Sequence, residues 1–371
     1  MKFGWSLAAI GVGLALGLTP VRADNEFLAP VVRVMNENGV APAAAAGAPT
    51  VNCADGGCAA PAASCNTSCC NVFTPQMIGS DLPSNIYAGT FFANQFVAGY
   101  GLLPQVQRGS FKVADNESPA PTDRFFVTYS YYNNVRAPAV QLGALPNGGF
   151  GLVNRQVSTD VHRQTFGFEK TFLGGDASIG VRMNTIQQDG DIQDDEFGDT
   201  TIIGKYALIN REDLLFSIGI GVTTPTGTAN AGALGAPYRS VLIQPYSGFI
   251  WNRDRLFVQG FNSIITSTDS RDPNFGTYDI GLGYRLYQAA NCKDGWLTYI
   301  IPTAEAHANL VSTKQGWANR VDYALPDSLI TTLGVHFGLC GKANLTIGAG
   351  CPVSGPKLYD VSGLAQLNWR F

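Results

Sequence analysis

Charged residues are scarce in this chain of 371 residues, and long apolar runs are nearly absent. Asp, Glu, Lys and Arg together make up 14% of the sequence, against roughly 25% in an ordinary soluble domain. Beyond residue 18, no segment offers the ~18 consecutive apolar residues that a spanning helix needs, which excludes a helical inner-membrane protein. Without Lys2 and Arg22, 22 basic residues face 28 acidic ones, and such an acidic balance leaves no footprint for nucleic acid.

The first 23 residues are typical of a secretory signal peptide. Lys2 gives a positive start, the run from Phe3 to Leu18 is apolar, and Val21-Arg22-Ala23 fits a small-residue cleavage site. The apolar run is short for a membrane-spanning helix, although an uncleaved anchor is the alternative. We therefore expect cleavage after Ala23 and export to the periplasm, the outer membrane or the medium.

The composition of the rest favours strands with two different faces. Glycine contributes 43 residues and aromatic residues 11%, yet mean hydropathy is near zero. In the segment 216–223, Phe, Ile, Ile and Val alternate with Ser, Gly, Gly and Thr. A period of two places these sets on opposite sides of a strand, and glycines on an inner face reduce crowding where a closed sheet curves.

Twelve candidate strands follow one another from Arg124 onward, most of them close to the ten residues of a tilted transmembrane strand. They are expected at 124–133, 160–172, 177–187, 198–209, 214–224, 240–251, 255–266, 276–288, 296–310, 328–338, 343–350 and 358–371. The connections alternate in length. Long ones are expected at 134–159, 188–197, 225–239, 267–275, 311–327 and 351–357, and short ones at 173–176, 210–213, 252–254, 289–295 and 339–342.

This pattern predicts an all-β fold, a transmembrane antiparallel β-barrel of about twelve strands over residues 124–371. Long outer loops and tight periplasmic turns are typical of outer-membrane barrels. Because an open sheet edge in lipid would leave backbone groups without partners, the strand at 358–371 should pair with the strand at 124–133. A secreted β-sandwich or adhesin is the alternative, although it would not require the alternation of loop lengths.

The last strand alternates strictly and ends in an aromatic residue. Odd positions from Tyr359 to Phe371 are mostly apolar, and even positions are mostly polar. This stretch resembles the closing strand of bacterial outer-membrane barrels, whose terminal aromatic is the assembly signal. The resemblance implies that Trp369 and Phe371 contact the barrel-assembly machinery and that the barrel lies in outer-membrane lipid.

The region before the strands differs from the barrel in composition. Residues 24–75 are rich in Ala, Pro and Cys and are predicted to form a disordered periplasmic linker. Residues 76–123 could form a plug, an extra strand or a lid. Because the periplasm favours disulfides, seven cysteines are candidates for pairing, and five in the tail is an odd number. They are Cys53, Cys58, Cys65, Cys69 and Cys70 in the tail, and Cys292 and Cys340 in adjacent turns.

Strand parity assigns a set of mostly charged side chains to the lumen. They are Glu169, Arg182, Lys205, Asp279, Arg285, Glu305, His307, Asn309, His336, Asp360 and Arg370. Side chains can fill the interior of an eight-stranded barrel, and a barrel of twelve strands is wider. We therefore expect an open, water-filled lumen whose lining selects among solutes. Alternatively, these charges pair with one another and plug the barrel.

Within this set, two imidazoles and a carboxylate form the group best suited to chemistry. Glu305 and His307 lie two apart on one strand face, and His336 follows on the next strand. Such groups can bind zinc or transfer protons. No serine stands at a matching position as a nucleophile, so we predict a lumen lining rather than a hydrolase, with no metal and no cofactor.

Three stretches resemble one outer-membrane family, the transporter-like proteins named after the meta-pathway of phenol degradation. They are Phe197–Leu208, with a Gly-Asp strand start, Leu215–Gly227, with a Gly-x-Gly strand closing in Pro-Thr-Gly, and Tyr278–Leu286, with a late Gly-x-Gly-Tyr. The stretch Ala114–Arg124 also looks like planctomycete members of such barrels. The resemblance implies a porin-like channel for passive passage of small, hydrophobic or aromatic solutes. A plugged structural or adhesive surface barrel is the alternative.

Overall fold

In a computed structural model of the chain, two units are separated by their internal contacts, residues 1–63 and 64–371. All described residues belong to the second unit. They are 74–80, 85–86, 89–92, 95–98, 103–104, 112–144, 150–190, 194–227, 240–268, 274–289, 296–312, 327–354, 357 and 359–371. Among them, no helix is long and apolar enough to cross a membrane. The predicted signal peptide and the linker up to residue 73 lie outside the described residues.

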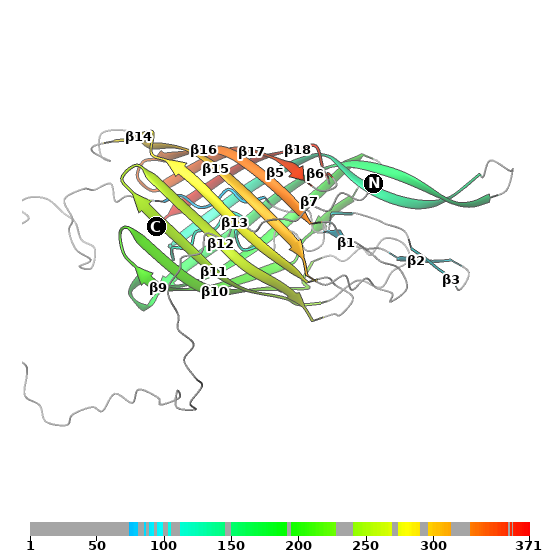
Figure 1. Cartoon of the computed structure of the whole chain (residues 1–371), viewed down its shortest axis with the longest axis horizontal. Coiled ribbons are helices and arrows are strands. Elements are labelled where there is room, and N and C mark those ends of the chain that lie inside the picture. The colour runs from blue at the N-terminus through cyan, green and yellow to red at the C-terminus, as the bar shows by residue number, and fades with distance from the viewer. Residues whose placement is uncertain are drawn as a thin grey trace, which may run out of the picture. The chain divides into compact units, whose positions relative to one another are not determined.

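Twelve long antiparallel strands form a closed barrel (Figure 1). In order around the barrel they are β5 (Arg124–Ala144), β6 (Phe150–Phe172), β7 (Ala177–Gly190), β9 (Thr200–Asn210), β10 (Leu214–Thr224), β11 (Leu242–Arg253), β12 (Leu256–Ser267), β13 (Phe275–Tyr284), β15 (Leu297–Val311), β16 (Ser328–Leu339), β17 (Ala343–Ser354) and β18 (Val361–Arg370). The barrel closes where β18 pairs with β5, from Val361 opposite Asn133 to Arg370 opposite Arg124. Closure leaves no exposed sheet edge.

Short elements complete the described chain. They are β1 (Asn85–Ile86) paired with β4 (Leu103–Pro104), β2 (Gly89–Phe92) paired with β3 (Gln95–Ala98), β8 (Asp194–Phe197) beside β7, β14 (Tyr287–Gln288) beside β15, and the single helical turn η1 (Leu173–Gly175). We call the barrel end that carries the tight turns at 173–176, 211–213, 254–255 and 340–342 the short-turn rim. Arg124 and Phe371 lie at this rim.

Side chains in the described parts of the long strands alternate between a largely apolar exterior and a buried interior that carries most of the polar groups. On β13, Tyr278, Ile280 and Leu282 are about half exposed, whereas Thr277 and Asp279 between them are buried. The same period on the other strands leaves many large apolar side chains on the outer surface, including Phe168, Ile179, Met183, Leu333 and Ile347. The exterior is therefore apolar and the lumen carries the polar groups, the reverse of a soluble protein.

All twelve predicted strands are confirmed, and several loop boundaries are wrong. The predicted loop at 134–159 is mostly strand, because β5 and β6 continue as a paired hairpin to Ala144 and from Phe150. The predicted loop at 188–197 likewise contains the end of β7 and β8. In both places pairing continues after the regular apolar alternation has stopped, so the loss of alternation does not mark the end of pairing. The predicted strand at 276–288 ends at Tyr284, and β14 forms a separate short piece.

Candidate functional site in the barrel lumen

Two segments that precede the first barrel strand lie inside the barrel. We call residues 74–80 and 112–123 the lumen segments. Residues 74–80 and 112–119 are all buried, although they belong to no strand. Their polar atoms contact inward-facing side chains from opposite walls, such as Glu305 on β15 and Arg182 on β7. The interior, which the number of strands predicted to be open, is therefore occupied by residues 74–80 and 112–119 of the chain itself.

A ring of four buried charges ties one lumen segment to the wall. Glu117 Oε1 lies 2.7 Å from Arg124 Nη2 and 2.8 Å from Lys205 Nζ. Across the ring, Glu169 Oε2 lies 2.8 Å from Arg124 Nε, and its Oε1 lies 3.0 Å from Lys205 Nζ. Two positive and two negative charges balance, and each touches both opposite charges, which offsets the cost of removing all four from water.

The cations of the wall also bind the backbone of the same segment. Lys205 Nζ donates to the carbonyl of Ser118 over 2.6 Å, and Arg124 Nη1 donates to the carbonyl of Asn116 over 2.8 Å. Arg182 donates to the carbonyls of Lys112 and Asp115 at 2.7 and 3.0 Å. These donors satisfy carbonyls that have no strand partner, so the segment can be buried without bare polar groups.

A second charged cluster lies on β13 and β15. Lys112 Nζ lies 2.5 Å from Asp279 Oδ1, and His307 Nδ1 lies 2.8 Å from that same oxygen. His307 Nε2 lies 3.3 Å from Glu305 Oε2. Both ring nitrogens of His307 thus lie near carboxylate oxygens, and of the two only Nδ1 makes a hydrogen bond. With Lys112, the cluster consists of one lysine, one histidine and two carboxylates, all of them buried.

The Glu305 carboxylate binds the backbone of the other lumen segment, residues 74–80. Its two carboxylate oxygens accept hydrogen bonds from the N–H groups of Ile78 and Gly79, at 2.8 and 2.9 Å. Gly79 has φ +86°, and a Cβ there would lie 2.5 Å from Asp115 Oδ1. A side chain at this position is excluded both by the conformation and by space. Gln366 on β18 donates to the carbonyl of Ile78 over 2.6 Å.

The lumen segments also have an apolar side. It packs against the inner faces of β9, β11 and β12. The buried cluster consists of Met77, Val113 and Ala114 from the lumen segments and Ile203, Tyr246 and Phe261 from the wall. Burying large apolar side chains contributes roughly 1.5–3 kcal/mol each. The segments are thus held by ion pairs on one side and by apolar packing on the other.

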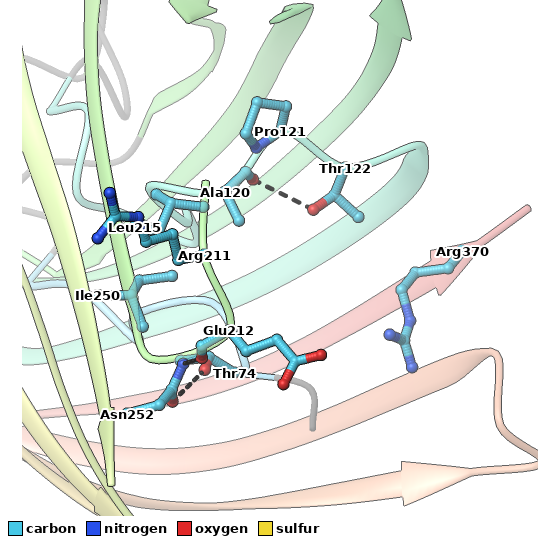
Figure 2. Close-up of a pocket in the computed structure, with 10 residues that line it drawn as sticks. All are labelled: Thr74, Ala120, Pro121, Thr122, Arg211, Glu212, Leu215, Ile250, Asn252 and Arg370. Carbon is cyan, nitrogen blue, oxygen red and sulfur yellow. Dashed lines mark hydrogen bonds between the residues drawn. The ribbon is translucent and has the colours of Figure 1, made fainter. Parts of the chain in front are cut away.

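A pocket of about 360 Å³ opens at the short-turn rim between a lumen segment and the wall. Figure 2 shows Ala120, Pro121 and Thr122 on one side of it, and Leu215 and Ile250 on the wall of β10 and β11. The remaining lining is polar. It consists of Thr74, Arg211, Glu212, Asn252 and Arg370. Thr74 Oγ1 donates to Asn252 Oδ1 over 3.1 Å, which fixes the start of the first lumen segment at the pocket edge.

Arg285 and His336 were also assigned to the lumen by parity, and each has partners outside the two charged clusters. Arg285 lies just beyond β13 and donates to Asn252 Oδ1 over 2.9 Å, and burial lowers the pKa of its guanidinium. His336 is buried, and its ring nitrogens contact Thr346 and Thr303. Those contacts separate it from the His307 cluster.

Two positions at strand ends depart from the parity assignment. Asp360 is exposed just before β18 and accepts a hydrogen bond from Asn134, so its assignment to the lumen is wrong. Parity fails at Asp360 because β18 begins at Val361, so Asp360 precedes the strand and does not follow its alternation. Arg370 lies at the rim and donates to the carbonyl of Gly341. The remaining member, Asn309, is buried and donates to Ser328 Oγ over 3.3 Å.

The predicted assembly residues face outward at the short-turn rim. Trp369 and Phe371 are about half exposed. Phe371 stacks on Phe168 with ring centroids 5.6 Å apart, and Lys170 Nζ lies 5.3 Å from its centroid. Their role in assembly stays a prediction.

Of the seven cysteines predicted to pair, Cys340 is the one that lies within the described residues. Cys340 carries a free, exposed thiol in the turn after β16. Its predicted partner Cys292 and the tail cysteines lie outside the described residues, as do their pairings. Cys351, also free and exposed, faces outward on β17. Within the described chain, no group of three or more His, Cys, Asp or Glu side chains is placed to hold a metal ion.

Sequence reasoning missed the lumen segments' own functional groups, Lys112, Asp115, Asn116 and Glu117. Strand parity cannot find them because they lie outside strands. The composition did indicate these groups, since the stretch from Lys112 to Arg124, both included, holds five charged residues in a chain that is only 14% charged. Charges that concentrate beside the first strand have to find partners, and the nearest unpaired charges face the lumen.

The fold and the lumen together define a closed twelve-stranded β-barrel that is occupied by its own N-terminal segments. No protein-family model and no curated protein matches the chain. Solved structures with a similar barrel include an outer membrane channel from Pseudomonas putida F1, at 14% identity and a TM-score of 0.43 over 68% of this chain and 96% of that one. They also include the KdgM porin in complex with disordered oligogalacturonate, at 10% identity and a TM-score of 0.39 over 66% of this chain and 99% of that one. The NanC porin is similar at 8% identity and a TM-score of 0.39, over 66% of this chain and 98% of that one. These similarities concern the fold alone.

Proposed function

We propose that the protein is an outer-membrane channel for small solutes whose lumen segments act as a gate. The observation that carries this proposal is the way in which the lumen is filled. Charged side chains on β5, β6, β7, β9, β13 and β15 bind two segments that belong to no strand. A segment that is not part of the sheet can move without breaking the barrel.

The surface of the barrel supports a membrane location. Its outward side chains are largely apolar, and aromatic residues such as Phe125, Phe172, Trp251 and Trp369 are exposed at strand ends. In a closed barrel all backbone groups at lipid depth find partners in neighbouring strands. An exported chain with this surface would be insoluble in the periplasm, which leaves the outer membrane as the compartment that suits it.

Planar-bilayer conductance of the purified protein tests the gate. We expect the full chain to give small or rare current steps, because the lumen segments fill the interior. Deleting residues 24–123 should give large, steady steps, since twelve strands enclose more space than side chains fill. Deleting residues 24–73 is the matched control, because it removes the tail and keeps both lumen segments, and it should behave like the full chain.

Heat-resistant migration of each protein in gels would establish that the barrel is folded. Silence from a folded protein that lacks residues 24–123 would contradict a channel. That result would favour the second candidate function, a plugged structural or adhesive surface barrel. The specific observation behind this alternative is the pair of buried charged clusters, whose ion pairs bind the lumen segments to the wall.

The proposed solute class rests on the resemblance of three sequence motifs. The motifs at Phe197–Leu208, Leu215–Gly227 and Tyr278–Leu286 resemble the family named after the meta-pathway of phenol degradation, and this resemblance favours hydrophobic or aromatic solutes. The proposal includes no catalytic step. His307 and His336 have separate partners, and the contacts of His336 are two threonine hydroxyls in a fully buried position.

A further inference from the structure

His307 lies between the two wall carboxylates that hold the lumen segments. Its Nδ1 lies 2.8 Å from Asp279 Oδ1, and its Nε2 lies 3.3 Å from Glu305 Oε2. Asp279 forms an ion pair with Lys112 of one segment, and Glu305 accepts two backbone N–H groups from residues 74–80, the other segment. One imidazole is therefore in contact with a wall carboxylate of each segment.

The two lumen segments also hydrogen-bond to one another. The N–H of Ser80 donates to Asp115 Oδ1 over 3.1 Å, and Lys112 Nζ donates to Ser80 Oγ over 3.0 Å. The N–H of Met77 donates to the carbonyl of Glu117 over 2.8 Å. Because these bonds join the segments, we expect both to dock on the wall and to leave it as one unit. Weakening either wall contact should loosen both.

A single proton decides whether the contact between His307 Nε2 and Glu305 is attractive. Nδ1 donates to Asp279, so in the neutral imidazole Nε2 carries a lone pair. Nε2 is fully buried and has no hydrogen-bond partner among the described residues. With a proton on Nε2, an imidazolium faces the Glu305 carboxylate, and the charges of the cluster with Lys112 balance. Without that proton, the cluster holds one excess negative charge, which is costly in a buried site.

The neighbouring strand on the other side of β15 contributes no charge to this contact. Among the described residues, β16 places Ile330 opposite His307 and Thr332 opposite Glu305. The histidine of β16, His336, contacts threonine hydroxyls instead. The charged and titratable groups that face the imidazole from the packed elements are therefore Asp279 on β13, Glu305 on β15 and Lys112 on the lumen segment.

We infer that His307 makes the gate sensitive to pH, holding the lumen segments docked while it is protonated and allowing their release as the pH rises. The inference rests on the proposed function, because it assigns a control to the proposed gate. Since the proton favours the docked state, docking must favour the proton, and a falling proton concentration shifts the equilibrium towards release. One bound proton can change this equilibrium by at most about tenfold per pH unit.

Hydrogen exchange of the full-length protein between about pH 5.5 and about pH 9 tests the switch. This range lies above the ordinary pKa values of carboxylic acids, ~4, and contains that of imidazole, ~6.5. Protection factors, which remove the intrinsic pH dependence of exchange, should fall about tenfold or more for residues 74–80 and 112–119 as the pH rises. Those of β10 to β12 should stay constant. Equal protection of the segments at both ends of the range would overturn the inference.

Variants of two histidines separate His307 from other titrating groups. His307→Gln cannot take up the proton, so its segments should show low protection that does not vary with pH. His307→Lys keeps a positive charge and should stay protected at about pH 9. His336→Gln is the matched control, because His336 is also fully buried and has no charged partner among the described residues, and it should keep the wild-type profile. A wild-type profile in His307→Gln, with a heat-resistant barrel, would overturn the inference.

Conductance distinguishes the switch from the function on which it rests. The full chain should pass more current at the alkaline end of the range, whereas the protein without residues 24–123 should conduct equally at both ends, because it has no segments to release. Protection that falls with pH, together with silence of that deletion, would retain the switch and reject the channel. Steady current steps from the deletion, with protection that does not vary in the full chain, would retain the channel and reject the switch.

Discussion

Removing one charge from the ring formed by Glu117, Arg124, Glu169 and Lys205 should release the lumen segment without unfolding the barrel. Glu117→Gln removes two of the four ion pairs and leaves one excess positive charge among side chains that are 0–5% exposed. Breaking a buried pair by neutralising one partner costs about 3–5 kcal/mol. The docked state should therefore lose about a hundredfold or more in its equilibrium with the released state.

Hydrogen exchange followed by mass spectrometry measures this release. In Glu117→Gln, backbone N–H groups of residues 112–119 should exchange faster, whereas those of β10 to β13 should keep their protection. Asp213→Asn, on an exposed turn, is the matched loss of a carboxylate and should change nothing. Unchanged exchange in the lumen segment, or equal acceleration in every strand, would refute the reasoning.

A compensating substitution tests whether charge balance is the cause. Lys205→Met alone leaves one excess negative charge. Combined with Glu117→Gln, it leaves the balanced pair Arg124–Glu169 and should restore part of the protection, because the two substitutions are coupled. The rescue should be incomplete, since Lys205 also donates to the carbonyl of Ser118. Additive losses would mean that the charges act independently.

Two further perturbations act at other points of the structure. Gly79→Ala should destabilise the docked state of the first lumen segment by a few kcal/mol, because φ is +86° and the new Cβ meets Asp115. The rate of protease cleavage near residue 80 should therefore rise, and a rate equal to that of the wild type would contradict this. At the short-turn rim, burial raises the pKa of Asp123, but hydrogen bonds from Lys170 and Thr171 outweigh it and hold that pKa below its usual value. A lowered pKa means that this stabilisation is present above the carboxyl's ordinary pKa of ~3.9 and is lost as the pH falls through the lower folded value. Asp123→Asn should therefore reduce the loss of heat resistance between neutral and strongly acidic pH, and an identical pH profile for both proteins would contradict this.

The position of the strands could be derived from the sequence because the lipid-facing and lumen-facing environments differ so strongly. In β13 the alternation of Tyr278, Ile280 and Leu282 with Asp279 and Gly281 suffices to predict the strand and its facing. Regular alternation of apolar and polar residues is lost beyond Asn133 and beyond Gln187, although the β5–β6 hairpin and β7 continue there. Pairing there depends on the neighbouring strand, and the amphipathic pattern does not record it.

The sequence by itself determined the fold, because period-two alternation, loop lengths and low charge are local properties of the chain. It also predicted most of the charged wall residues that face inward, but it missed Arg163 and wrongly included Asp360 at a strand end. The partners of those charges were decided only by the tertiary structure. Glu305 binds the backbone of Ile78, 227 positions away, and only the closed barrel brings the two together. Burial of that contact makes an unpaired charge costly, so the lumen charges bind the chain's own segments rather than lining an empty pore.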